Sequence, residues 1–266
     1  MSGVSSYMDA VAEVARIAGD IAKGFYGRSP ETRTKNDGSP VSIADINAER
    51  SAREWIEQRF PDDGIVGEEL SPVRADAARR WILDPIDGTY TFLQGVPLWG
   101  TLVAVAEGER VIAGAAYFPV LDEIIAAAPG EGCWWNGTRA RVSTVSELGE
   151  ARLVTTDARF TRDVARRERW LRLQNSARKM RTWGDSYGYL LVATGRADIM
   201  VDEIVSEWDV AAMMPIIAEA GGVFTDWRGS ETFCGGDAIA TNGKLAGIVR
   251  EILAPSGAPA SAGAAS

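Results

Sequence analysis

Apolar residues recur at intervals of three and four between residues 8 and 25, which is the spacing of one face of a helix. Ser6 marks the start of this predicted amphipathic helix. The next segment, 27–40, is polar and rich in turn residues, and it predicts a loop. Ser42 then stands at the N-cap of a second predicted helix, which carries Asp45 in its first turn. The start of the chain therefore predicts two helices joined by a polar loop.

Short apolar runs replace the helical spacing beyond this point and predict strands. Residues 65–66 form a brief run. A helical or turn segment over 71–80 leads to the run Trp-Ile-Leu at 81–83, which an Asp-Pro pair ends. A turn with two tryptophans is expected at 132–137. Three longer runs, separated by turn residues, predict an antiparallel meander at 102–106, 111–118 and 124–128.

Helices and strands alternate after residue 141, as is typical of an α/β unit. The predicted strands are 153–154, 197–201, 222–225 and 238–240, and the predicted helices are 161–173, 185–195, 210–220 and 244–253. The final segment contains only Ala, Gly, Ser and Pro, which predicts a disordered tail. The chain is thus expected to comprise an α+β subdomain at 1–141, an α/β subdomain at 142–254 and a tail at 255–266.

Composition narrows the possible chemistry. A formal charge of −9 argues against nucleic acid and against an anionic membrane as partners. The same charge would repel an anionic substrate unless a bound cation intervened. The sequence contains no histidine, which excludes imidazole-ligated zinc and catalysis by Ser-His-Asp or Cys-His groups. Chemistry must therefore use carboxylates, hydroxyls, amines or a metal ion.

Two further observations concern the cellular compartment. Cys133 and Cys234 lie far apart and form no metal or redox spacing, so we expect reduced, buried side chains. No apolar run reaches the length of a transmembrane helix, and the start of the sequence has no leader pattern. The sequence predicts a cytoplasmic protein without a membrane partner.

Acidic residues stand at four separate places. Asp84 and Asp87 follow the apolar run at 81–83, so their carboxylates and the carbonyl of Ile86 could converge on one point. Oxygen-only ligation of this kind suits Mg²⁺ or Mn²⁺, although an Asx-turn would explain the same residues. The other three places are Asp45, Glu68 with Glu69, and Asp209. Helix-dipole complementarity would explain the two aspartates, and a solvated loop would explain the glutamates.

In combination and in this order, these acidic residues resemble the inositol monophosphatase superfamily of metal-dependent phosphatases. The residues that carry the resemblance are Lys35, Val41-Ser42-Ile43-Ala44-Asp45, Gly67-Glu68-Glu69, Asp84-Pro85-Ile86-Asp87-Gly88-Thr89, and Trp208-Asp209 with the helix ending Glu219-Ala220-Gly221-Gly222. The resemblance covers nearly the whole chain except the tail. It implies an α/β fold in the form of a layered α-β-α-β-α sandwich, with two subdomains around a metal cleft.

The resemblance also implies a metal site of two or three Mg²⁺ ions per subunit, with Mn²⁺ as a possible substitute. Glu68, Asp84 and the carbonyl of Ile86 match the ligands of a first ion. Asp84, Asp87 and Asp209 match those of a second, with Asp84 bridging the two. A third, looser ion in the family also uses Glu68.

Catalytic roles follow from the same resemblance. Asp45 and Thr89 match the pair that orients and deprotonates the attacking water, and Glu68 is counted with them as catalytic. The backbone amides of Gly88 and Thr89 would meet the phosphate. Hydrolysis of a phosphate monoester needs charge stabilisation on the attacking and leaving oxygens, which paired cations supply.

The second half of the chain carries the expected substrate determinants. The stretch at 181–189, Arg-Thr-Trp-Gly-Asp-Ser-Tyr-Gly-Tyr, is similar to that of bacterial histidinol-phosphate phosphatases, and so is Gly95-Val96-Pro97-Leu98-Trp99. Asp185 would then bind the cationic groups of the substrate through charge-assisted hydrogen bonds. Asp202 falls where the family places an acidic substrate ligand, with Glu203 beside it. The alternatives are a helix N-cap for Asp185 and solvated loop positions for the other two.

The sequence therefore predicts Mg²⁺-dependent hydrolysis of a small-molecule phosphate monoester, histidinol phosphate, to histidinol and phosphate. An inositol monophosphatase or a related sugar-phosphate phosphatase is the alternative on the same site. A binding protein that contacts RNA or the transcription machinery is a third hypothesis, because some superfamily members resemble such regulators. The acidic charge and the complete ligand set argue against it. Family members are commonly dimers, so a homodimer is expected.

Overall fold

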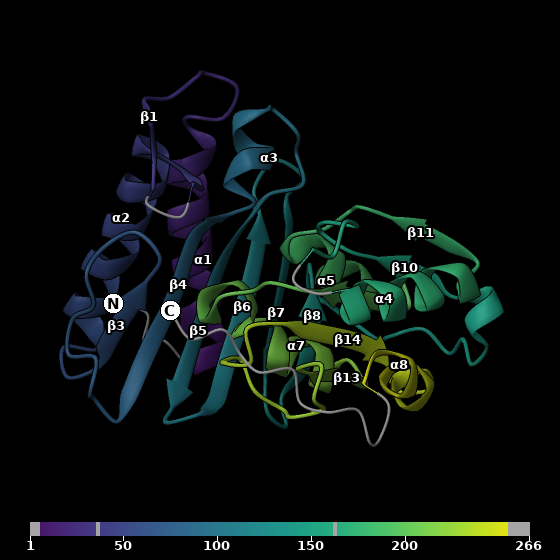
Figure 1. Ribbon diagram of the computed structural model, residues 1–266. Coiled ribbons are helices and arrows are strands. Elements are labelled where there is room, and N and C mark those ends of the chain that lie inside the picture. The colour runs from purple at the N-terminus through teal and green to yellow at the C-terminus, as the bar shows by residue number, and fades with distance from the viewer. Residues whose placement is uncertain (1–5, 36–37, 162–163, 255–266) are drawn as a thin grey trace.

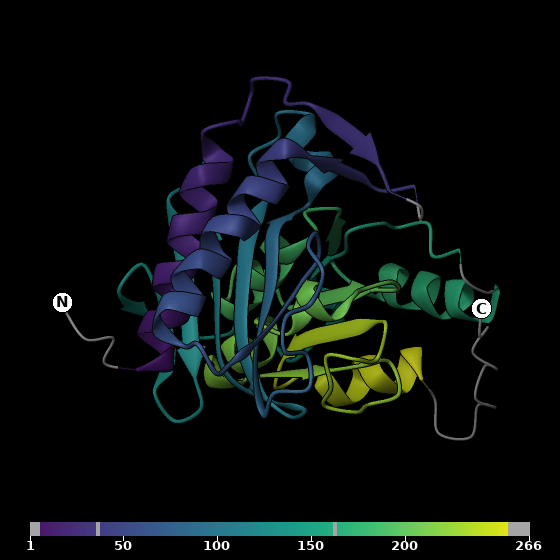
Figure 2. The same ribbon diagram turned by 90° about the vertical axis from the view of Figure 1, so that its left-hand side faces the viewer.

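Helices and sheets alternate through five layers in the computed structural model, which describes residues 6–35, 38–161 and 164–254 (Figure 1 and Figure 2). A helix pair covers the outer face of a seven-stranded sheet. A second group of helices lies between that sheet and a five-stranded sheet, whose far face is covered by a third group. The predicted α-β-α-β-α sandwich is confirmed.

The second strand of the seven-stranded sheet ends with the predicted aspartate pair, Asp84 and Asp87. The first two strands of this sheet run parallel to each other, and every other pair of neighbouring strands is antiparallel. The antiparallel part includes the predicted meander. Trp81, Ile82 and Leu83 are buried, as expected of a strand that is covered on both faces. The strands, in order across the sheet, are β3 (Gly64–Gly67), β4 (Arg79–Asp87), β5 (Gly100–Glu107), β6 (Arg110–Phe118), β7 (Glu123–Ala128), β8 (Gly132–Trp135) and β9 (Thr138–Arg139).

The outer helices are α1 (Tyr7–Lys23) and α2 (Ile43–Arg59), which pack against each other and against this sheet. Ser6 caps α1, because its hydroxyl accepts a hydrogen bond from a backbone N–H one turn later. Ser42 and Asp45 form a reciprocal capping box at the start of α2. Both helix starts are as the sequence predicts, and the second one fixes the position of a candidate catalytic carboxylate.

The five-stranded sheet comes from the second half of the chain. Its strands, in spatial order, are β11 (Lys179–Arg181), β10 (Arg152–Val154), β12 (Ile199–Asp202), β14 (Ala238–Asn242) and β13 (Gly222–Thr225). The first three run parallel, and β14 runs antiparallel to both of its neighbours. The helices between the two sheets are α5 (Ser186–Ala193), α6 (Glu207–Val210) and α7 (Met213–Glu219), and the outermost helices are α4 (Val164–Ser176) and α8 (Ala246–Leu253).

Four local predictions differ from the structure. The segment predicted as a loop contains a two-stranded ladder, β1 (Thr32–Thr34) with β2 (Pro40–Ser42). The predicted tryptophan turn begins with strand β8, which pairs with β7. A short helix, α3 (Thr89–Leu93), follows the aspartate pair, where the sequence predicted no helix. The predicted helix at 210–220 is split into α6 and α7, since Pro215 has no N–H to donate to the preceding turn.

The predicted boundary at residue 141 falls between the last strand of one sheet and the first strand of the other. A single buried cluster joins the two halves, with Phe118 from β6 and Leu190 from α5 among its members. The two-subdomain division stays a prediction, and the tail at 255–266 lies outside the described residues. Neither cysteine forms a disulfide, and Cys133 is buried as predicted. The prediction is wrong for Cys234, which is exposed. Among the described residues, no helix is long and apolar enough to cross a membrane.

Candidate active site

An irregularity at the end of β4 brings Asp84 and Asp87 to the same side of the sheet. In a regular strand, residues three positions apart point to opposite faces. The register between β4 and β5 shifts between these two aspartates, and a bulge of this kind re-aims the side chains that follow it. Within the bulge, the carbonyl of Pro85 accepts a hydrogen bond from the Thr101 hydroxyl at 2.8 Å. The carboxylates converge as predicted, because the strand is interrupted between them.

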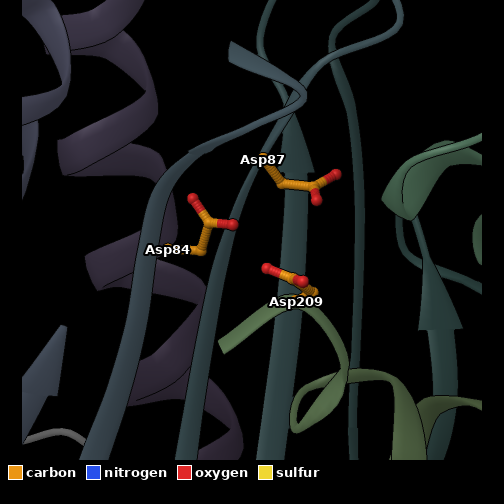
Figure 3. A group of neighbouring side chains, drawn as sticks. All are labelled: Asp84, Asp87 and Asp209. Carbon is orange, nitrogen blue, oxygen red and sulfur yellow. The ribbon is translucent and has the colours of Figure 1, made fainter. Parts of the chain in front are cut away.

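Asp209 adds a third carboxylate from the other half of the chain (Figure 3). The backbone N–H of Ser206 donates to Asp209 Oδ2 at 2.7 Å, which fixes the side chain at the start of α6. Asp87 is held from α5, since the backbone N–H of Ser186 donates to its Oδ2 at 2.6 Å. One carboxylate oxygen from each of Asp84, Asp87 and Asp209 lies within 4.8 Å of the other two. The three side chains could share a metal ion.

Burial and mutual repulsion disfavour the ionised forms of these carboxyls. Burial raises the pKa of Asp84 well above its usual value, and the charges of Glu68 and Asp87 raise it further. Burial, with the charges of Asp185 and Asp209, raises the pKa of Asp87 in the same way. Burial also raises the pKa of Asp209, to about 7. Hard divalent cations prefer oxygen ligands and would offset this repulsion, so the residues fit the metal implied by the resemblance.

The repulsion predicts how the stability of the metal-free protein varies with pH. Aspartates in an unfolded chain ionise near pH 4, whereas the pKa of Asp209 in the folded protein is about 7. Between these values the folded state binds more protons than the unfolded state, so stability decreases as pH rises. With a chelator present to remove metal ions, Asp209→Asn should therefore unfold at a higher temperature than wild type at pH 8. The unfolding temperatures of the two proteins should converge at pH 4.

Two controls accompany this measurement. Asp76→Asn changes an exposed aspartate and should leave the pH dependence of the unfolding temperature as in wild type. Adding Mg²⁺ should stabilise the wild-type protein more at pH 8 than at pH 5, because ionised carboxylates bind the cation. The same pH dependence in wild type and Asp209→Asn would contradict the prediction.

Glu68 lies in the loop after β3, beside the aspartate cluster. Its backbone N–H donates to the carbonyl of Leu83 at 3.2 Å, which places the loop next to the end of β4. Lys35 Nζ donates to Glu68 Oε1 at 2.6 Å and to Glu69 Oε1 at 2.8 Å. Burial opposes the charged form of Lys35, but the two hydrogen bonds outweigh it and raise the pKa of the lysine. A cation on Glu68 would thus share that carboxylate with Lys35.

The proposed water-activating pair is within hydrogen-bonding reach. Thr89 Oγ1 lies 3.3 Å from Asp45 Oδ1 and 3.0 Å from the carbonyl oxygen of Ile86. The other oxygen of Asp45 accepts the backbone N–H and the hydroxyl of Ser42, at 2.8 and 2.6 Å. Burial raises the pKa of Asp45, while the bonds from Ser42 lower it. The predicted ligand carbonyl and the predicted proton acceptor therefore meet at one hydroxyl.

A pocket of about 320 Å³ opens next to this pair. It lies between α3 and the loop before α5, and its lining includes Gly88, Tyr90, Thr91, Leu98 and Asp185. Asp185 Oδ2 accepts a hydrogen bond from Thr91 Oγ1 at 3.1 Å. A Cβ on Gly88 would lie 2.7 Å from the same oxygen, so the glycine leaves room for the carboxylate. Asp185 occupies the N-cap of α5, but its side chain forms no capping hydrogen bond there.

The other two predicted substrate ligands are buried and bound to protein groups. Asp202 Oδ1 accepts the backbone N–H of Thr156 at 2.9 Å, and Oδ2 accepts the Tyr189 hydroxyl at 3.0 Å. Burial raises the pKa of Asp202 to about 6. Glu203 Oε2 accepts the backbone N–H of Thr161 at 2.7 Å. Neither acidic residue is among the described residues that line the pocket, so their direct contact with substrate stays a prediction. Neither is a solvated loop residue.

Comparison with known proteins agrees with this geometry. The family model described as "Inositol monophosphatase family" matches residues 4–258. This chain belongs to that family. The histidinol-phosphatase of Chlorobaculum parvum is 39% identical over 246 residues, which are 92% of this chain and 94% of that protein. The histidinol-phosphatase of Mycobacterium tuberculosis is 38% identical over 217 residues, 80% and 84% of the two chains. The structure of a Thermotoga maritima IMPase superposes with a TM-score of 0.83 at 29% identity, covering 93% of this chain and 96% of the other.

Membership of the inositol monophosphatase family confirms the resemblance inferred from the sequence motifs. The family is metal-dependent, and in this member the buried aspartate cluster could bind a metal ion.

This inositol monophosphatase family member also has a buried charged pair near the site, Glu49 and Arg53, to which the sequence pattern assigned no role. Glu49 of α2 accepts the backbone N–H groups of Glu69 and Leu70, at 2.8 and 3.2 Å, and the Arg53 Nε–H at 2.7 Å. Arg53 also donates to the Leu70 carbonyl at 2.9 Å. The pair thereby holds the loop that carries the predicted glutamate ligand. The spacing of Asp45, Glu49 and Arg53 at four-residue intervals, on a helix face that should be apolar, was a signal for it.

Proposed function

We propose that this chain hydrolyses L-histidinol phosphate to L-histidinol and phosphate. Three relatives that cover most of the chain, at 34–39% identity, are histidinol-phosphatases. The observation that carries the assignment is the carboxylate of Asp185 at the pocket beside the aspartate cluster. Histidinol phosphate has an ammonium group and a protonatable imidazole, and a carboxylate favours both through charge-assisted hydrogen bonds.

We assign two or three divalent cations to the aspartate cluster, Mg²⁺ in preference to Mn²⁺. Asp84, Asp87 and Asp209 would hold one of them, and Glu68 with Asp84 and the Ile86 carbonyl would hold another. Cations in this place would neutralise the charge of the phosphate and lower the pKa of an attacking water. The oxygen-only donor set and the raised pKa values of the aspartates support this assignment.

Thr89 and Asp45 would then orient and deprotonate the water. The Thr89 hydroxyl can accept a proton from water as it passes its own to Asp45 Oδ1, 3.3 Å away. Ser42 holds the other oxygen of Asp45, so the free oxygen stays directed at Thr89. The backbone amides of Gly88 and Thr89 are proposed to orient the phosphate, and Asp185 to bind the cationic end of the substrate.

An inositol or sugar phosphate is the second candidate substrate. The Thermotoga maritima IMPase has the same fold and covers almost the same length. A neutral polyol, however, has no cation for Asp185 to pair with. The homodimer and the cytoplasmic location remain predictions, from the family resemblance and from the unpaired cysteines respectively.

A substrate panel with Asp185→Asn tests the assignment. The variant keeps the size of the side chain and its acceptor for Thr91 but removes the charge. Loss of a charge-assisted hydrogen bond should cost roughly 1.5–3 kcal/mol, which lowers kcat/KM for histidinol phosphate about ten- to a hundredfold. Hydrolysis of glycerol phosphate or inositol phosphate should stay level or rise, because the metal site is unchanged.

Phosphate release is the measurement for every member of the panel. Equal losses on both substrate classes would show that Asp185 supports the structure of the pocket rather than binding the cationic groups of the substrate. A wild-type preference for inositol phosphate over histidinol phosphate would overturn the proposed function, and the second candidate would replace it.

A further inference from the structure

The backbone of Asp185 adopts a conformation that residues with a side chain rarely adopt. Its φ is 49° and its ψ is −158°, outside the small left-handed helical region and close to one that is essentially reserved for glycine. Asparagine and aspartate tolerate the left-handed helical region better than other residues do, but this ψ lies far from it. Strain of this kind persists only where surrounding contacts hold it, and it is concentrated at functional sites.

Contacts on both sides of Asp185 hold this conformation. Its backbone N–H donates to Thr156 Oγ1 at 2.8 Å, and its carboxylate accepts from Thr91 at 3.1 Å. The preceding residue, Gly184, packs its backbone directly on Thr156, since a Cβ there would lie 2.1 Å from the Thr156 Cα. The peptide before Asp185 is therefore fixed against Thr156. Rotation of φ to a negative value would swing the carboxylate away from Thr91.

Thr156 is in turn anchored to buried groups. Its backbone N–H donates to Asp202 Oδ1 at 2.9 Å, and Asp202 Oδ2 accepts the Tyr189 hydroxyl at 3.0 Å. Asp202 is 5% exposed and Tyr189 is 2% exposed. The backbone carbonyl of Asp202 also accepts the indole N–H of Trp227 at 3.1 Å. A buried aspartate whose carboxylate and backbone carbonyl both accept hydrogen bonds forms a rigid support.

We propose that Asp202 is a positioning residue that acts through Thr156 on the strained Asp185, rather than a direct ligand of the substrate. By holding Thr156, it keeps the Asp185 carboxylate over Gly88 at the pocket and so maintains the preference for a cationic phosphate ester. This inference rests on the proposed function for its specificity readout, whereas the strain at Asp185 is tested independently of any substrate.

The strain is tested by comparing Asp185→Gly with Asp185→Ala. Both variants lack the carboxylate and its hydrogen bond to Thr91, but only glycine relieves the backbone strain at this φ and ψ. A glycine normally makes a protein less stable than an alanine does, because it loses more conformational freedom on folding. Here the order should reverse, with Asp185→Gly unfolding about 2–4 °C above Asp185→Ala. An alanine variant that is as stable as the glycine variant, or more stable, would overturn the strain argument.

The positioning role is tested with two variants of Asp202. Asp202→Asn keeps an oxygen for the Thr156 N–H but has no charge, whereas Asp202→Ala removes the acceptor. If Asp202 is a positioning residue, Asp202→Asn should keep the wild-type ratio of kcat/KM for histidinol phosphate to kcat/KM for glycerol phosphate. Asp202→Ala should lower that ratio roughly fivefold or more. If Asp202 instead binds the cationic end of the substrate directly, Asp202→Asn should also lose the preference for histidinol phosphate. That outcome would overturn the proposal.

Because alanine at a buried position can unfold the protein, Thr156 provides a second pair. Thr156→Val removes the hydroxyl that accepts the Asp185 N–H but keeps the shape, and Thr156→Ser restores the hydroxyl. The valine variant should lose the cationic preference through a higher KM, and the serine variant should retain it. Equal behaviour of the two, or an equal loss on both substrates, would contradict the proposal.

Failure of the proposed function is recognised separately. A wild-type enzyme without preference for histidinol phosphate would reject the proposed function and, with it, the specificity role of Asp202. A wild-type preference that survives Thr156→Val would reject the positioning inference alone.

Discussion

We expect Asp84→Asn to reduce kcat at saturating Mg²⁺ below about a thousandth of the wild-type value. Asparagine keeps the shape of the side chain and the oxygen that accepts the backbone N–H of Ile86, at 3.0 Å. It removes the charge at the centre of the carboxylate cluster, where we propose that two cations share this residue. Phosphate release at increasing Mg²⁺ measures the loss, and calorimetry of Mg²⁺ binding should show weakened affinity.

The stability of the same variant should change in the opposite direction. Asp84 is 1% exposed, and burial raises its pKa, as do the charges of the neighbouring carboxylates of Glu68, Asp87 and Asp209. A neutral side chain ends that repulsion, so the metal-free Asp84→Asn protein should unfold at a higher temperature than metal-free wild type at pH 8. Retention of more than a tenth of wild-type activity would contradict the ligand assignment. Lower stability with lost activity would indicate a damaged fold instead.

The candidate site could be predicted from the sequence where residue type and spacing are sufficient. Asp84 and Asp87 are close enough in the sequence to suggest that they converge, and the family resemblance added Asp209 to them. The three lie in one cluster. The helix starts at Ser6 and Ser42 were also predictable, since an N-cap is a local signal. Local patterns and the family motif thus predicted the layers of the fold and the three carboxylates that lie together in it.

Features that depend on tertiary contacts could not be predicted in this way. The bulge that lets Asp84 and Asp87 face the same side is a register shift against β5, a strand that follows later in the chain. The buried position of Asp202 depends on Thr156 and Tyr189, which lie on other elements. From the sequence alone, an acidic residue at the end of an apolar strand could equally line a pocket or be buried among protein groups. The ladder of β1 and β2 joins two polar segments with no alternation of apolar residues.

Substitution of a water-activating residue should affect turnover but not metal affinity, unlike substitution of a metal ligand. Thr89→Ala should reduce kcat by about 10²–10⁴, the range expected when acid–base assistance is lost. The hydroxyl of Thr89 is the group that connects Asp45 to the site, at 3.3 Å, and alanine leaves Asp45 without that partner. Affinity for Mg²⁺, measured by calorimetry, should change little, because no carboxylate has been altered.

Thr89→Ser is the matched control, since it restores the hydroxyl without the methyl group and should recover most of the lost kcat. Ser42 still holds the other oxygen of Asp45 in both variants, so the fold at the start of α2 should be the same in each. A proton-accepting role also requires that KM changes less than kcat, because the hydroxyl acts mainly in the transition state. Weakened Mg²⁺ binding in Thr89→Ala would show that the hydroxyl supports the Ile86 carbonyl, 3.0 Å away, rather than the water. Failure of serine to recover activity would reject the hydroxyl as the catalytic group.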